Sequence, residues 1–177
     1  MNLNQSLSRA AMLLSVMATV QILLQLPNLP SPLASRFGWA GKAIGWTTPA
    51  SFTTINLVFI AAILGITILL PNLMGKRPRL RWWRLPNRDY WLAPENLPKT
   101  VEYVKRQLAW HGVMTLLLLM AVFQLVVEAN RHNPPVLDTT RVLIFIVAYV
   151  VFMLLWSFMF WRKFARLPPD KRANPFG

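Results

Sequence analysis

Four long apolar runs constrain the fold of this chain of 177 residues more than any other feature. They span residues 10–26, 52–70, 108–127 and 142–161. A helix of about 20 apolar residues crosses a hydrocarbon core of about 30 Å. The sequence therefore predicts an all-α integral membrane bundle of four transmembrane helices. The rest of the chain is too short for a second domain with its own core, so we expect a single domain over residues 1–177.

The first run has an alternative interpretation as a signal peptide. Arg9 precedes it, and Ala34 is a possible cleavage position. Pro32 fits the small-residue cleavage pattern poorly, so we predict that the run is a membrane span.

Basic residues are distributed unevenly between the loops. Of the 19 Lys and Arg residues, 15 lie before the first run, between the second and third, or after the fourth. Basic residues remain on the cytoplasmic side of a membrane protein. We therefore predict that both termini and the basic loop over residues 76–106 are cytoplasmic.

The same loop predicts contact with an anionic bilayer, because Arg alternates there with Trp and Leu. Each basic residue near anionic lipid contributes about 1 kcal/mol, and Trp anchors at the interface. Arg with aromatic residues also suits nucleic acid, but a basic segment beside a membrane span is explained by lipid, and we predict no nucleic-acid partner. The predicted lipid-contacting residues are Arg79, Arg81, Trp82, Trp83 and Arg84.

The third helix is expected to start before the membrane. Pro98 suits a first helical turn, where its missing N–H needs no partner. The helical run from residue 98 to 129 is too long for the membrane alone. It should protrude into the cytoplasm or kink near Gly112.

Polar residues within the spans give two alternatives. With the predicted orientation they fall toward the outer half of the membrane, where they either line an outward-facing polar cavity or form hydrogen bonds that fix helix packing. Ala11, Ser15 and Thr19 also form a small-residue stripe, whose partner helix is in this chain or in another. The candidate cavity residues are Gln21, Gln25, Asn56, Gln124, Glu128 and Arg141.

Chemistry-bearing patterns are sparse. Cys is absent, which excludes thiolate nucleophiles and thiolate metal sites. Glu128, His132 and Asp138 lie near one another, but a helix break at residues 133–135 favours a solvated connection over a metal site. No GxSxG, HExxH, Walker or GxGxxG motif is present. We predict a protein that is not an enzyme and has no metal or cofactor.

Two loop segments are distinctive. In the outer loop, Gly residues permit turns and aromatic residues seat the loop at the interface. In the basic loop, prolines bracket a turn whose Tyr and Trp insert at the interface and whose carboxylates pair with Arg. The outer-loop residues are Pro27, Pro30, Arg36, Phe37, Gly41, Gly45 and Trp46, and the inner ones are Pro86, Asn87, Asp89, Tyr90, Trp91, Pro94 and Glu95.

These two segments resemble the motifs of the bacterial SdpI-type membrane domain. The outer segment is similar to LPxxIPxHFxxxGxxDGW, with Arg36 at the usual His and Ile44 at the usual Asp. The inner segment PNRDYWLAPE differs at Arg88 from a form with Lys. The resemblance implies a multi-pass protein of the bacterial inner membrane without an established activity. One branch of that family acts in immunity and signalling against a secreted toxin.

Three functions remain open from the sequence. The first is a non-enzymatic protein that recognises a peptide or protein partner through its loops. The second is an accessory subunit of a larger membrane complex. The third is a small transporter or membrane enzyme that uses the polar residues around Glu128, although that carboxylate has no clearly paired second acid or base.

Overall fold

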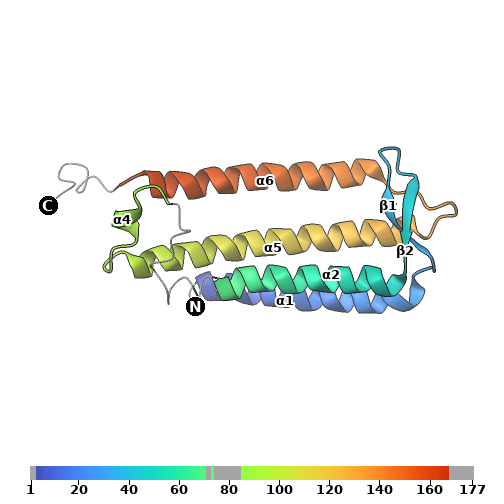
Figure 1. Cartoon of the computed structure of the whole chain (residues 1–177), viewed down its shortest axis with the longest axis horizontal. Coiled ribbons are helices and arrows are strands. Elements are labelled where there is room, and N and C mark those ends of the chain that lie inside the picture. The colour runs from blue at the N-terminus through green and yellow to red at the C-terminus, as the bar shows by residue number, and fades with distance from the viewer. Residues whose placement is uncertain (1–2, 71–72, 74–84, 168–177) are drawn as a thin grey trace.

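The computed structural model describes residues 3–70, 73 and 85–167. The chain has four long helices and a two-stranded sheet. Figure 1 shows the long helices side by side, with the sheet at one end. Helices α1 and α2 lie together, α5 runs beside them, and α6 lies on the far side of α5. The elements in chain order are α1 (Leu3–Gln25), η1 (Leu26–Asn28), β1 (Leu33–Phe37), β2 (Ala43–Thr47), α2 (Pro49–Leu64), η2 (Gly65–Leu69), α4 (Arg88–Trp91), α5 (Leu97–Ala129) and α6 (Thr139–Ala165).

The prediction of four membrane-spanning helices is confirmed. By length and composition, the helical stretches Ser6–Asn28, Pro49–Leu69, Leu97–Ala129 and Thr139–Ala165 are long and apolar enough to cross a membrane. Helices α5 and α6 extend beyond the predicted apolar runs at both ends. Helix α5 begins at Leu97, as Pro98 predicted, and is continuous through Gly112. Its 33 residues correspond to about 50 Å at about 1.5 Å per residue, so it is longer than a hydrocarbon core is thick.

The starts of two spans are fixed by short polar side chains. Thr48 precedes α2, and its side chain accepts a hydrogen bond from the Ser51 N–H at 3.1 Å. Asp138 precedes α6 and accepts from the Arg141 N–H at 3.0 Å. Each bond satisfies a backbone donor that has no partner within the helix.

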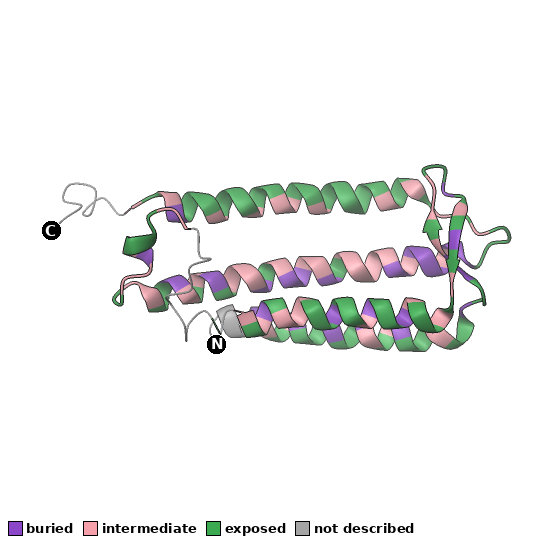
Figure 2. Ribbon diagram, viewed as in Figure 1, coloured by how far each residue is buried: buried purple, intermediate pink, exposed green. Residues whose placement is uncertain are grey.

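Helices α1, α2 and α5 form the core, whereas α6 is peripheral. The buried side chains of this core include Ile22, Ile60, Leu116 and Phe123. The small-residue stripe on α1 belongs to it, since Ala11 and Ser15 are buried within the chain. In Figure 2, α6 is exposed along most of its length and buried only at its last turn.

Helix α5 contacts an irregular segment of the second span at Gly112. The last turns of that span, η2, form a π-helix, in which Thr67 is buried. A Cβ at Gly112 would overlap the hydroxyl of Thr67. Gly112 therefore allows α5 to pass directly against this π-helical segment, where any larger residue would separate the helices.

The outer loop contains a β-hairpin, which the all-α prediction missed. Strands β1 and β2 pair antiparallel, with Leu33 opposite Thr47 and Phe37 opposite Ala43. Gly41 lies in the turn with a φ of 75°, a conformation that few residues other than Gly adopt. The strands have only five residues each. Such a small sheet depends on packing against the helices, which hydropathy does not reveal.

Candidate functional site

The polar residues predicted for a cavity form a chain of side-chain hydrogen bonds. Gln21 on α1 donates from Nε2 to Oε1 of Gln124 on α5 at 3.1 Å. Gln124 in turn donates to Oε1 of Glu128 at 3.2 Å. Arg141 on α6 contacts Oε2 of Glu128 at 3.3 Å and Oδ2 of Asp138 at 3.0 Å. The chain links three of the four helices and ends in an exposed ion-pair cluster.

The other two candidate residues lie outside this chain of hydrogen bonds. Asn56 is buried and donates to the Phe52 carbonyl of its own helix at 2.9 Å. Gln25 is half-buried on the last turn of α1. Within the described part of the chain, Oε1 of Gln21 and Oγ1 of Thr53 are buried without a hydrogen-bond partner. Whether these groups line a functional cavity stays a prediction.

The hairpin is attached to the helices by a buried amide. The side chain of Asn130, directly after α5, bonds the N–H and the carbonyl of Ala34 in β1. Leu33 and Ala34 are fully buried beneath it. At the other side of the hairpin, the Leu137 N–H donates to the Gly41 carbonyl at 2.9 Å, and a Cβ at Gly41 would overlap the Leu137 carbonyl.

The other outer-loop residues lie on the hairpin or before it. The side chain of Arg36 lies across Gly45, where a Cβ would overlap its guanidinium. Phe37 is half-buried and Trp46 is 51% exposed. Pro27 lies in η1, and Pro30 follows it on the surface.

An apolar hollow lies between the hairpin and the first turns of α6. Its volume is about 530 Å³, and its walls are mostly apolar side chains. On the hairpin side, Trp39 is completely exposed and Ile44 is 68% exposed. Its apolar lining includes Phe37, Trp39, Ile44, Leu137, Leu143 and Ile146.

The inner motif folds back onto the end of α6. Asn87 adopts the left-handed region at a φ of 51° and donates from Nδ2 to the carbonyls of Phe164 and Ala165, both at 3.1 Å. The indole N–H of Trp91 donates to the same Phe164 carbonyl at 3.0 Å. The last carbonyls of a helix have no partner within it. The motif therefore caps α6.

The indole of Trp91 packs against the protein. It is only 9% exposed and lies edge-on against the Phe164 ring at 5.5 Å between centroids. Its position at the membrane interface stays a prediction. The motif backbone is held as well, because Thr100 on α5 donates to the Trp91 carbonyl at 2.8 Å. Tyr90 is half-buried beside the indole.

The carboxylates of the motif are exposed. Asp89 and Glu95 form no ion pair with any basic residue that the structure describes. Pro86 and Pro94 flank the short helix α4 at either side. The predicted lipid contacts Arg79, Arg81, Trp82, Trp83 and Arg84 lie outside the described residues.

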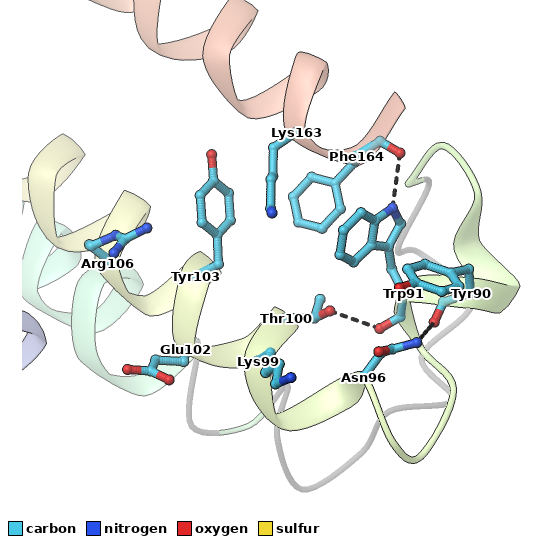
Figure 3. Close-up of a pocket in the computed structure, with 10 residues that line it drawn as sticks. All are labelled: Tyr90, Trp91, Asn96, Lys99, Thr100, Glu102, Tyr103, Arg106, Lys163 and Phe164. Atoms are coloured by element: carbon cyan, nitrogen blue, oxygen red, sulfur yellow. Dashed lines mark hydrogen bonds between the residues drawn. The ribbon is translucent and has the colours of Figure 1, made fainter. Parts of the chain in front are cut away.

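Next to the motif lies a cationic aromatic cluster, shown in Figure 3. Tyr103 on α5 lies between Arg106 and Lys163. The Arg106 guanidinium carbon is 5.4 Å from the Tyr103 ring centroid, and the Lys163 ammonium is 5.9 Å from it. The same ammonium lies 5.2 Å from the Trp91 ring. These distances suit cation–π attraction.

Sequence reasoning missed the residues that bond to loop backbone. Asn130 and Thr100 were not singled out, although both hold a motif in place. The sequence contains one indication of Asn130, namely that it is a polar residue at the end of a long apolar helix. Nothing in the sequence pointed to Thr100, which is an ordinary helical position.

The described side chains contain no candidate metal centre. Within residues 3–70, 73 and 85–167, no three His, Asp or Glu side chains are grouped to hold a metal ion. Comparisons with models of protein families, with curated proteins and with solved structures found no match to this chain. The resemblance of the two loop motifs to the SdpI-type domain therefore stays an expectation.

Proposed function

We propose that this chain is a non-enzymatic, multi-pass protein of the bacterial inner membrane that recognises a peptide or protein partner at its β-hairpin. The observation that carries the proposal is the hollow of about 530 Å³ beside the completely exposed Trp39. Exposed Trp on a loop held by rigid helices is typical of recognition surfaces. An immunity or signalling role, as implied by the sequence resemblance, fits such a surface.

The hairpin is better suited to recognition than the inner motif. Asn87 and Trp91 are both occupied in capping α6. Trp39 and Ile44, in contrast, project their apolar surface away from the core. The hairpin also carries the exposed cations Arg36 and Lys42. These features favour an apolar or amphipathic partner that presents acidic groups.

The proposed orientation places the hairpin outside the cytoplasm and both termini inside it. It rests on the uneven distribution of Lys and Arg between loops. The basic loop then faces the anionic inner leaflet, which is its proposed lipid partner. A reporter fused after Gly177 should be active in the cytoplasm only, and activity only outside would overturn the orientation.

A photo-crosslinking residue at position 39 tests the recognition proposal. In cells, it should join the chain to a discrete peptide or protein, and Ile44→Ser should reduce the yield several-fold. The matched control places the same photo-crosslinker at Leu154, which is 66% exposed in the middle of α6. Crosslinks to phospholipid alone from position 39 would mean that the hairpin is only a membrane anchor.

A second candidate is an accessory subunit of a larger complex. It is favoured by the exposure of α6, because the most apolar stretch of this helix has no residue buried within the chain and is free to pack against another protein. Gentle extraction of a tagged chain followed by native mass spectrometry should then show a fixed-ratio partner. The transporter alternative has less support, because both carboxylate oxygens of Glu128 already have partners in Gln124 and Arg141.

A further inference from the structure

A second hollow lies at the opposite end of the bundle from the hairpin. It is formed by the inner motif, the first turns of α5 and the last turn of α6, as Figure 3 shows. Its volume is about 390 Å³. Trp91, Tyr103 and Phe164 supply apolar walls, and the Phe164 ring packs edge-on against both of the other two rings.

The charge of this region is strongly positive. An adjoining hollow of about 470 Å³ shares Trp91, Tyr103 and Lys163 with the first. The acidic residue among the residues that line the two hollows is Glu102. The basic residues that line them are Lys99, Arg106, Arg162, Lys163 and Arg166.

Two of these cations are held in place by aromatic rings. Lys163 and Arg106 both contact the Tyr103 ring, and Lys163 also contacts Trp91. Among the described residues, no carboxylate lies within ion-pairing distance of Lys163. Its positive charge is thus positioned but not neutralised by a described carboxylate. Because the Lys163 side chain is already ordered, an anion that binds it loses less affinity to the conformational entropy of ordering that side chain.

The hollow lies where the apolar part of α6 ends. Trp161 is the last aromatic residue before the basic pair Arg162 and Lys163. In a bilayer this is the depth of the lipid phosphates, to which basic residues at helix ends extend. An anion held there would have an apolar wall on one side and cations on the other.

We propose that this hollow binds a phosphate group, with Lys163 contacting its oxygens, with Trp91 and Tyr103 forming the wall, and with Arg106 on the other side of the Tyr103 ring adding positive charge. Guanidinium and ammonium groups are the usual protein partners of phosphate. The phosphate belongs either to an anionic lipid headgroup or to a soluble molecule. This proposal does not depend on partner recognition at the hairpin, since the two hollows are at opposite ends of the bundle.

Native mass spectrometry of the full chain in detergent tests the proposal. The probes are phosphatidylglycerol and inorganic phosphate, each titrated separately and then in competition. The double variant Lys163→Gln with Arg106→Gln should weaken binding of the effective probe at least tenfold. Lys105→Gln removes the same charge from an exposed neighbouring position of α5 and should change binding less than twofold. Lys163→Arg keeps the charge and should retain most binding.

The outcomes separate the two sources. Variant-sensitive binding of phosphatidylglycerol that inorganic phosphate fails to displace assigns the site to a lipid headgroup. Variant-sensitive binding of inorganic phosphate assigns it to a soluble phosphate. If the double variant binds both probes as Lys105→Gln does, the proposal is wrong. Circular dichroism confirms folding, and if the double variant is unfolded, Lys163→Gln alone is compared with Lys105→Gln on the same criterion.

Discussion

Asn130, one residue beyond α5, bonds both backbone groups of Ala34 in β1. Its Oδ1 accepts from the Ala34 N–H at 2.8 Å, and its Nδ2 donates to the Ala34 carbonyl at 2.9 Å. The amide thereby acts as a third strand would at that position of the sheet. The two residues are 96 positions apart, so this contact connects the first loop to the second half of the chain.

Replacing Asn130 with Ala should lower the free energy of unfolding by about 2 kcal/mol or more. The variant leaves the buried N–H and carbonyl of Ala34 unpaired, and each costs about 1–3 kcal/mol. Unfolding in mixed micelles of sodium dodecyl sulfate measures the change. His132→Ala, at an exposed position of the same connection, is the control and should have little effect. Equal stability of the two variants would show that the amide contact is not energetically important.

The two glycines of the hairpin should differ in their tolerance of Ala. Gly41 has positive φ, and a Cβ there would overlap the backbone of Leu137. Gly41→Ala should therefore cost about 1–3 kcal/mol. At Gly45 the obstructing group is the flexible end of Arg36, which can turn into solvent. Gly45→Ala should cost clearly less in the same unfolding assay, and the reverse order would contradict this hairpin geometry.

Loss of the cap should loosen the last turn of α6. Trp91→Phe keeps an aromatic ring but removes the N–H that bonds the Phe164 carbonyl. We expect faster hydrogen exchange in residues 160–165 and a stability loss of about 1 kcal/mol. Glu95→Gln changes an exposed residue of the same motif and should leave exchange unchanged. Unaltered exchange in Trp91→Phe would mean that the indole bond does not hold the helix end.

The close approach of α5 to the second span predicts a specific rescue. Gly112→Ala should destabilise the bundle by about 1–3 kcal/mol, because its Cβ would overlap the Thr67 hydroxyl. Thr67→Ala removes that hydroxyl and should recover part of the loss in the double variant. If the two losses of stability are instead additive in a double-mutant cycle, the side chains at positions 67 and 112 do not contact each other.

The hydrogen bond between Gln21 and Gln124 should contribute modestly to stability. Interhelical polar contacts in membrane proteins average about 0.6 kcal/mol. A cycle of Gln21→Leu, Gln124→Leu and both together should give a coupling energy of that order. A preserved cellular phenotype in the double variant would mark the contact as packing alone. Loss of the phenotype in a stable double variant would instead support a functional polar cavity.

Hydropathy was sufficient to predict the helices, because crossing a bilayer requires a long apolar run and leaves few alternatives. Pro98 also predicted the start of α5, since proline fits the first turn. These are local properties that a sequence carries directly.

The hairpin and the cap depend on contacts between distant residues. Asn87 bonds a carbonyl 77 positions away, and Asn130 bonds Ala34 across 96 positions. No periodicity or residue spacing in the sequence predicts either of these hydrogen bonds. The packing of Trp91 against Phe164 was not predicted for the same reason, because an aromatic residue near a membrane span fits both the interface and a local core.

The attachment of the hairpin to residues 130 and 137 determines an order of assembly. Residues 33–47 are synthesised well before α5 and the connection after it. Until those residues are made, Ala34 and Gly41 lack their final hydrogen-bond partners. The hairpin is therefore translated early in the chain but completed late, when residues 130 and 137 become available to bond its backbone.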